Sequence, residues 1–143
     1  MQRAIELAKQ AESLDEVPVG AVIVKDDQVV GEGFNAPITG TDPTAHAEIT
    51  ALRNAALHIG NYRLIDTTLY VTLEPCLMCV GAIIHARVAT VVYGAQEPKT
   101  GAAGSAFDLL TSDKHNHRLE VRGGVLADQC ANLMTEFFSK KRY

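Results

Sequence analysis

Cysteine is scarce in this chain, which has three cysteines among 143 residues. Small secreted proteins that depend on disulfides carry more cysteines, so we expect no disulfide framework. Two of the three, Cys76 and Cys79, stand close together, and a metal or redox use of this pair becomes the better hypothesis. Cys130 lies within a helical pattern, and we expect it to be a small buried residue.

Long apolar runs are also absent. None approaches the roughly 20 residues that a membrane span needs, and the N-terminus MQRAIELAKQ lacks the apolar stretch of a signal peptide. We therefore expect a cytoplasmic protein with no membrane association. The hydrophobic content of 47% is enough to bury a core without disulfides, and there is no repeat or linker. These features predict one domain over residues 1–143.

Positive charge is in deficit, because the formal net charge is −4. Taken alone, this charge argues against a nucleic-acid partner. The distribution is uneven, however: residues 1–98 carry 6 Lys and Arg against 12 Asp and Glu, whereas residues 99–143 carry 7 against 5 and end in SKKRY. A local basic footprint for RNA and an ordinary solvated face both remain as explanations of the C-terminal excess.

The hydrophobic pattern predicts alternating helices and strands. Asp42-Pro43 is typical of a helix start, with an acidic N-cap followed by proline at the first helical position. A strand, helix, strand succession indicates a parallel strand pair with helices covering the sheet, so we expect an α/β fold. We predict helices over 1–14, 42–57, 75–86 and 128–141, and strands over 19–24, 29–35, 68–73, 88–93 and 119–121.

The stretch EPCLMC carries the strongest chemical signal. Cys76 and Cys79 stand at i and i+3 at a predicted helix start, so both thiols lie on one face of its first turn, where the helix N-terminus lowers thiol pKa. His46, in the sequence His46-Ala47-Glu48, is the best nitrogen ligand to complete a zinc site. On a helix His46 and Glu48 point about 200° apart, so both approach an ion only if it lies off the helix end.

Three protein ligands and an open position are typical of catalytic zinc, whereas structural sites close with a fourth ligand. No fourth cysteine or histidine stands at ligand-like spacing, and we expect the other histidines to be surface or packed residues: His58, His85, His115 and His117. A redox pair, which predicts a disulfide and no zinc, and a structural zinc module remain as non-enzymatic alternatives. Neither explains His46-Ala47-Glu48.

The order His46-x-Glu48 followed by Pro75-Cys76-x-x-Cys79 resembles the signature of the zinc-dependent nucleoside and nucleobase deaminases. Further stretches along nearly the whole chain resemble the bacterial tRNA-specific adenosine deaminase family: VPVGAV, DPTAHAE, NYRL, TLEPC, GAI, HAR, KTGAAGS and NH. This resemblance implies a three-layer α/β/α cytidine deaminase-like fold, with a central mixed sheet of about five strands covered by helices on both faces. A guanine or cytosine deaminase would keep the same metal set with a different pocket.

The resemblance also implies an activity and its residues. One Zn²⁺ per chain would be held by His46, Cys76 and Cys79, and Glu48 would move protons during hydrolytic deamination of adenosine to inosine. The implied substrate is adenosine at the wobble position, position 34, of a tRNA anticodon stem-loop, with arginine tRNA as the family's bacterial substrate. The implied enzyme is a homodimer.

Four positions are implied to contact RNA. The resemblance assigns Asn35 to a hydrogen bond with the target nucleoside, backbone near Ala47 to the base edge, and Lys99 to the anticodon loop. Glu97 stands where family members commonly have aspartate near the RNA sugar. Asn35 is equally well explained as a turn residue at the end of a strand.

Overall fold

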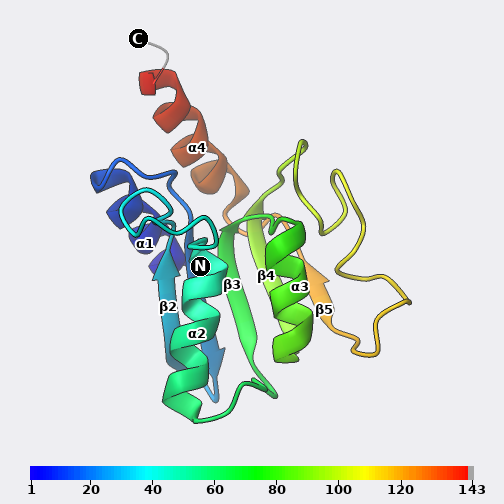
Figure 1. Ribbon diagram of the computed structural model, residues 1–143. Helices are drawn as coiled ribbons and strands as arrows, with labels where there is room; N and C mark the ends of the chain where they lie inside the picture. Colours follow the sequence, from blue (N-terminus) through cyan, green and yellow to red (C-terminus); the bar gives the residue numbers. More distant parts are fainter. Residues whose placement is uncertain (142–143) are drawn as a thin grey trace.

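The computed structural model describes residues 1–141, and its centre is a five-stranded sheet in the order β2-β1-β3-β4-β5 (Figure 1). Strand β1 is antiparallel to both of its neighbours, whereas β3, β4 and β5 are parallel to one another. The mixed sheet expected from the family resemblance is therefore confirmed. The strands are β1 (Gly20–Lys25), β2 (Gln28–Phe34), β3 (Thr68–Leu73), β4 (Thr90–Ala95) and β5 (Glu120–Arg122).

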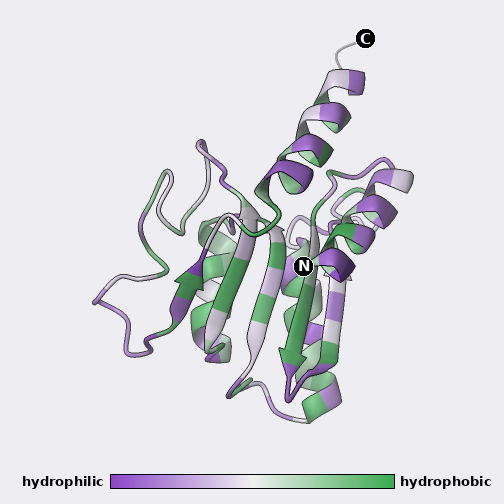
Figure 2. Ribbon diagram, turned by 180° about the vertical axis from the view of Figure 1, so that it is seen from behind, coloured by the Kyte–Doolittle hydropathy of each residue, from purple (hydrophilic) through white to green (hydrophobic). Residues whose placement is uncertain are grey.

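Helices cover both faces of this sheet, which gives three layers. The helices are α1 (Gln2–Ser13), α2 (Ala47–Ile59), α3 (Leu77–Ala86) and α4 (Ala127–Lys141). Helices α2 and α3 bury their apolar sides against one face, where Ile83 joins a core with Val71 and Val91. On the other face, seen from behind in Figure 2, Leu7 of α1 packs with Val22 and helix α4 contributes the buried Cys130. The expected burial of Cys130 is confirmed, because it is 1% exposed.

Strand directions place the starts of α2 and α3 at the same end of the strands. Because β1 is antiparallel to β2 and to β3, strands β2 and β3 run the same way, and β4 runs with them. The chain therefore leaves β2 and β3 at the same end of the sheet, where the strands finish. The helix after each strand begins there, at the upper end in Figure 1. Helix α2 lies close on β2, since a Cβ added at Gly31 would come within 2.5 Å of the Ala51 carbonyl oxygen.

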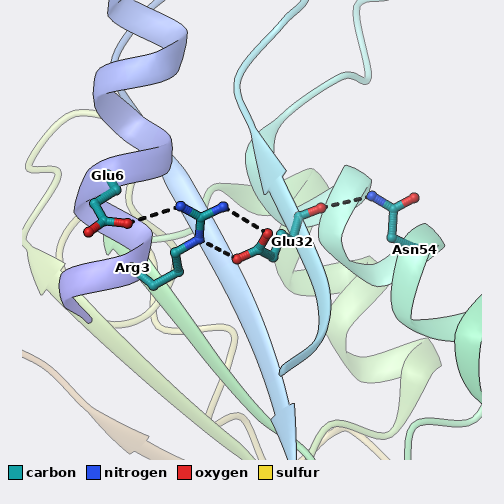
Figure 3. Close-up of polar contacts among 4 residues, drawn as sticks. All are labelled: Arg3, Glu6, Glu32 and Asn54. Atoms are coloured by element: carbon teal, nitrogen blue, oxygen red, sulfur yellow. Dashed lines mark hydrogen bonds and ion pairs between the residues drawn. The ribbon is translucent and has the colours of Figure 1, made fainter. Parts of the chain in front are cut away.

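A polar network fastens α1 to the β2 edge and β2 to α2 (Figure 3). Arg3 donates from Nε and Nη2 to the two carboxylate oxygens of Glu32, at 2.5 and 3.0 Å, and from Nη1 to Glu6 at 2.9 Å. The side-chain amide of Asn54 donates to the Glu32 carbonyl oxygen at 2.8 Å. The bidentate Arg3–Glu32 pair ties α1 to β2, and the single hydrogen bond from Asn54 ties α2 to the same strand.

The predicted helix start at Asp42-Pro43 is wrong. The Asp42 carboxylate accepts hydrogen bonds from the backbone N and the hydroxyl of Thr44, at 2.9 and 2.8 Å, and so closes a local turn instead of capping a helix. Helix α2 begins at Ala47, after His46 as N-cap. The predicted opening of α3 at Pro75 is also early, because this helix begins at Leu77.

All other predicted bounds agree with the structure within two residues. Arg142 and Tyr143 of the basic ending SKKRY lie outside the described residues. Over residues 1–141, no helix combines the length and the hydrophobicity that a membrane crossing requires.

Candidate active site

His46, Cys76 and Cys79 meet where α2 and α3 begin. His46 is the N-cap of α2 with extended backbone (φ −75°, ψ 154°), and Cys76 is the N-cap of α3 with extended backbone (φ −82°, ψ 179°). An N-cap residue lies outside the helical spiral, so the 200° separation expected for His46 and Glu48 within a helix does not apply. Cys79 follows in the first turn of α3 and is fully buried.

The spacing of these three side chains fits a tetrahedral metal ion. His46 Nδ1 lies 3.6 Å from Cys76 Sγ and 3.5 Å from Cys79 Sγ, and the three ligand atoms lie within 4.8 Å of one another. Zinc bonds of about 2.3 Å to sulfur and about 2.0 Å to nitrogen, at tetrahedral angles, separate S and N by about 3.5 Å. The donor set and its geometry therefore suit zinc, and the cluster has no fourth protein ligand among the described residues.

Burial and mutual hydrogen bonding shift the acidities of the cluster. The hydrogen bond with Cys79, followed by that with His46, lowers the pKa of Cys76. Cys79 shows the opposite shift, because its hydrogen bond to Cys76 and its burial raise its pKa. The hydrogen bond to Cys76 also raises the pKa of His46. A thiolate is thus favoured at Cys76, and a bound metal would displace the Cys79 proton and any proton on His46 Nδ1.

A cavity of about 270 Å³ opens beside the cluster. Its polar lining includes Asn35, Glu48 and Glu97 in addition to His46 and Cys76. Glu48 is 4% exposed, and its burial raises the pKa of the carboxyl group. A buried carboxyl group with a raised pKa beside a metal site is a candidate proton acceptor and donor in a reaction.

The predicted RNA contacts lie in three different settings. Asn35 follows β2 and Glu97 follows β4, and both line the cavity. Ala47 is fully buried in the first turn of α2. Lys99 lies on the exposed surface of the loop after β4, outside the cavity lining, and its backbone N donates to Glu97 Oε1 at 3.1 Å.

The apolar wall of the cavity was not predicted from the sequence. Val19 and Leu73 contribute from the sheet side, and Met134 and Phe138 contribute from α4. Phe138 remains 44% exposed although it is a large aromatic residue. The sequence marks no face of α4 as a cavity wall, because the exposure of Phe138 is known only from the structure.

The other histidines lie away from the three-ligand cluster. His115 Nε2 pairs with the Leu109 carbonyl oxygen at 2.6 Å, and His117 Nε2 pairs with the Val88 carbonyl oxygen at 2.8 Å. Within residues 1–141, one group of three His, Cys, Asp or Glu side chains lies close enough together to share a metal ion, and it consists of His46, Cys76 and Cys79.

The fold and the ligand cluster define a deaminase: the family described as MafB19-like deaminase matches residues 1–142. A tRNA-specific adenosine deaminase of Haemophilus influenzae is 56% identical over 143 residues, which covers 99% of this chain and 83% of that protein. The chain therefore belongs to the family of tRNA-specific adenosine deaminases.

Two solved structures are similar to this chain. One, from a study of A-to-I editing by tRNA:A34 deaminases at the wobble position of transfer RNA, has a TM-score of 0.90 and 41% identity, covering 93% of this chain and 96% of that chain. A guanine deaminase of Bacillus subtilis has a TM-score of 0.66 and 46% identity, covering 73% of this chain and 67% of that chain. The overall shape is nearer to the tRNA deaminase.

Proposed function

We propose that this protein hydrolytically deaminates adenosine to inosine at the wobble position of a tRNA anticodon, with arginine tRNA as the substrate. One observation carries the proposal: Glu48 lines a cavity beside the His46, Cys76 and Cys79 cluster. Full-length similarity to tRNA-specific adenosine deaminases supports the choice of substrate. Residues 1–143 would act as one catalytic domain in the cytoplasm.

His46, Cys76 and Cys79 would hold about one zinc ion per chain, which when bound lowers the pKa of water to about 7. Glu48 accepts the proton of the attacking water and delivers it to the ring nitrogen next to the reacting carbon. Glu48 then takes the proton of the hydroxyl group added at the reacting carbon and passes it to the departing amino group, so that a C=O bond forms as the C–N bond breaks and ammonia leaves. The buried position of Glu48 keeps these transfers away from bulk water.

The loops around the cavity would hold the RNA. Asn35 donates to or accepts from the target nucleoside, backbone near Ala47 faces the base edge, and Glu97 lies near the sugar. Lys99 faces the anticodon-loop phosphates. An anticodon loop suits the site because its bases are unpaired, so the target base leaves the stack at small cost before it enters the cavity.

The direct test incubates zinc-loaded protein with unmodified arginine tRNA that carries adenosine at the wobble position, and then digests the RNA and measures inosine. We expect inosine at that position with the wild-type protein and none with Glu48→Ala. A folded, zinc-containing protein that leaves the tRNA unchanged would overturn the proposal.

A guanine deaminase is the second candidate, because the Bacillus subtilis enzyme shares 46% of the aligned residues. It makes a different prediction: ammonia is released from free guanine in the absence of RNA. The same assay with cytosine and adenine covers the other small substrates. A structural zinc or redox module predicts no turnover with any of these substrates, and the redox case also predicts no zinc under reducing conditions.

We infer a homodimer for this enzyme. An apolar groove of about 440 Å³ between α2 and α3 supports this inference, with a lining that includes Ile49, Leu52, Met78 and Ala82. A second copy would cover this groove together with Tyr62, which also lines it and is 67% exposed. Sedimentation analysis over a range of protein concentrations tests the inference, and a monomer throughout that range would refute it.

A further inference from the structure

Glu74 is a buried carboxylate that the proposed chemistry does not use. It follows β3, stands two residues before Cys76 and is 3% exposed. Its Oε1 accepts hydrogen bonds from the backbone N of Glu97, at 3.1 Å, and from the Ser105 hydroxyl. Its Oε2 accepts from the backbone N of Ala103 and of Ser105, at 2.9 and 3.0 Å. All four donors belong to residues 97–105.

The loop of residues 97–105 is also shaped around this carboxylate. A Cβ added at Gly101 would come within 2.5 Å of Glu74 Cδ and 2.6 Å of Oε2, so only glycine allows this approach. The backbone N of Gly101 donates to the Glu97 carbonyl oxygen at 2.8 Å. The backbone N of Ala102 donates to the Pro75 carbonyl oxygen, also at 2.8 Å, which ties the loop to the segment that enters α3.

We infer that Glu74 is a positioning residue that holds loop 97–105 in the conformation in which Glu97 and Lys99 meet RNA. This inference rests on the proposed function for its substrate. Glu74 orients Glu97 directly by accepting a hydrogen bond from its backbone N. The Glu97 carboxylate in turn accepts a hydrogen bond from the backbone N of Lys99. The same buried carboxylate therefore joins the segment that carries Cys76 to the loop that borders the cavity.

Glu74→Gln tests the anchor with little change in side-chain volume. Each carboxylate oxygen accepts at least one backbone N–H, so whichever way the amide turns, its NH₂ group faces a backbone donor. We expect hydrogen exchange at the amides of Glu97, Ala103 and Ser105 to accelerate by roughly tenfold or more. We also expect KM for an anticodon stem-loop to rise about tenfold, with kcat and zinc content within about twofold of wild type.

Two further variants separate positioning from charge and from general stability. Glu74→Asp keeps the charge but shortens the reach, so we expect it to fail to restore protection and KM. Glu16→Gln is the matched control, because Glu16 is equally buried and accepts hydrogen bonds from a different loop, at Ile38 and Thr39. It should accelerate exchange in residues 38–39 and leave that of 97–105 unchanged.

The outcomes separate the anchor from the proposed function. Unchanged exchange in residues 97–105 of Glu74→Gln would overturn the anchor. Faster exchange with unchanged KM, or full recovery in Glu74→Asp, would overturn the positioning of RNA contacts. If the wild-type protein measured alongside makes no inosine, the proposed function fails and the RNA part of the inference falls with it, while the exchange data still decide whether Glu74 anchors the loop.

Discussion

Replacement of Glu48 by glutamine should separate metal binding from catalysis. Glu48 is 4% exposed, and glutamine has nearly the same size, so the substitution leaves no void. The ligand atoms of His46, Cys76 and Cys79 are untouched, and their spacing of 3.5 to 3.6 Å from the imidazole nitrogen to each sulfur should persist. An amide cannot take up and release the protons that the carboxylate transfers.

The size of the loss follows from the number of protons that Glu48 is proposed to move. One positioned acid or base contributes about 10²- to 10⁴-fold to the rate. Because Glu48 serves as both base and acid, we expect the upper end of this range, a fall in kcat of about 10⁴-fold. That fall corresponds to about 5.4 kcal/mol of transition-state stabilisation.

The assay measures zinc content, KM and kcat for the anticodon stem-loop in Glu48→Gln and, as the matched control, in Cys76→Ala. We expect Glu48→Gln to keep about one zinc ion per chain and wild-type KM while it loses turnover. Cys76→Ala removes one of three ligands and should lose both zinc and turnover. Equal zinc loss in the two variants, or activity within tenfold of wild type in Glu48→Gln, would refute this division of roles.

Three further changes probe the surroundings of the site. Glu16→Gln should lower the free energy of unfolding by about 1.5–3 kcal/mol at pH 7, measured by urea denaturation, because hydrogen bonds from Thr39 and Ile38 to a buried carboxylate are weakened. Burial opposes ionisation of Glu16, but these hydrogen bonds outweigh it and lower its pKa. The extra stability of the wild type over Glu16→Gln should therefore be present above the unfolded pKa of about 4.3 and disappear as pH falls through the lower folded pKa. A stability difference that is independent of pH would contradict this. Phe138→Ala should raise KM for the stem-loop by about 5- to 150-fold through lost base stacking, whereas unchanged KM would show that the exposed ring does not touch RNA. Lys99→Ala should weaken the binding of every RNA sequence by the same factor, and it should reduce the steepness of log K against log salt by about 1. An unchanged slope would show that Lys99 does not contact a phosphate.

Much of the fold could be predicted because each element carries its own local signal. The β-branched run in β1 and the parallel pair around α3 are strong hydrophobic patterns, and they appear within two residues of their predicted bounds. The predicted start of α2 was wrong because an aspartate such as Asp42 can either cap a helix or close a turn with its carboxylate. It accepts two hydrogen bonds from Thr44 and closes a turn, and the sequence alone does not separate that turn from an N-cap.

The ligand cluster could be predicted from spacing and residue type, whereas its supports could not. Glu74 reads as an ordinary charged residue beside proline, and only the structure shows that Ala103 and Ser105, about 30 positions later, donate to it. Phe138 likewise lines the cavity because α4 begins at the end of the strands where α3 also begins. Long-range contacts of this kind leave no periodic trace in the sequence.

The meeting of His46 and Cys76 follows from strand direction more than from either motif. Had β2 and β3 been neighbours in a simple antiparallel hairpin, the chain would leave them at opposite edges, and the two N-caps would lie a strand length apart. The insertion of β1 between β2 and β3, antiparallel to both, makes β2 and β3 run the same way. Both helices then begin at the same end of the strands, and their partial positive charges converge on the ligand cluster. Sheet order therefore builds the site, and the two sequence motifs supply its ligands.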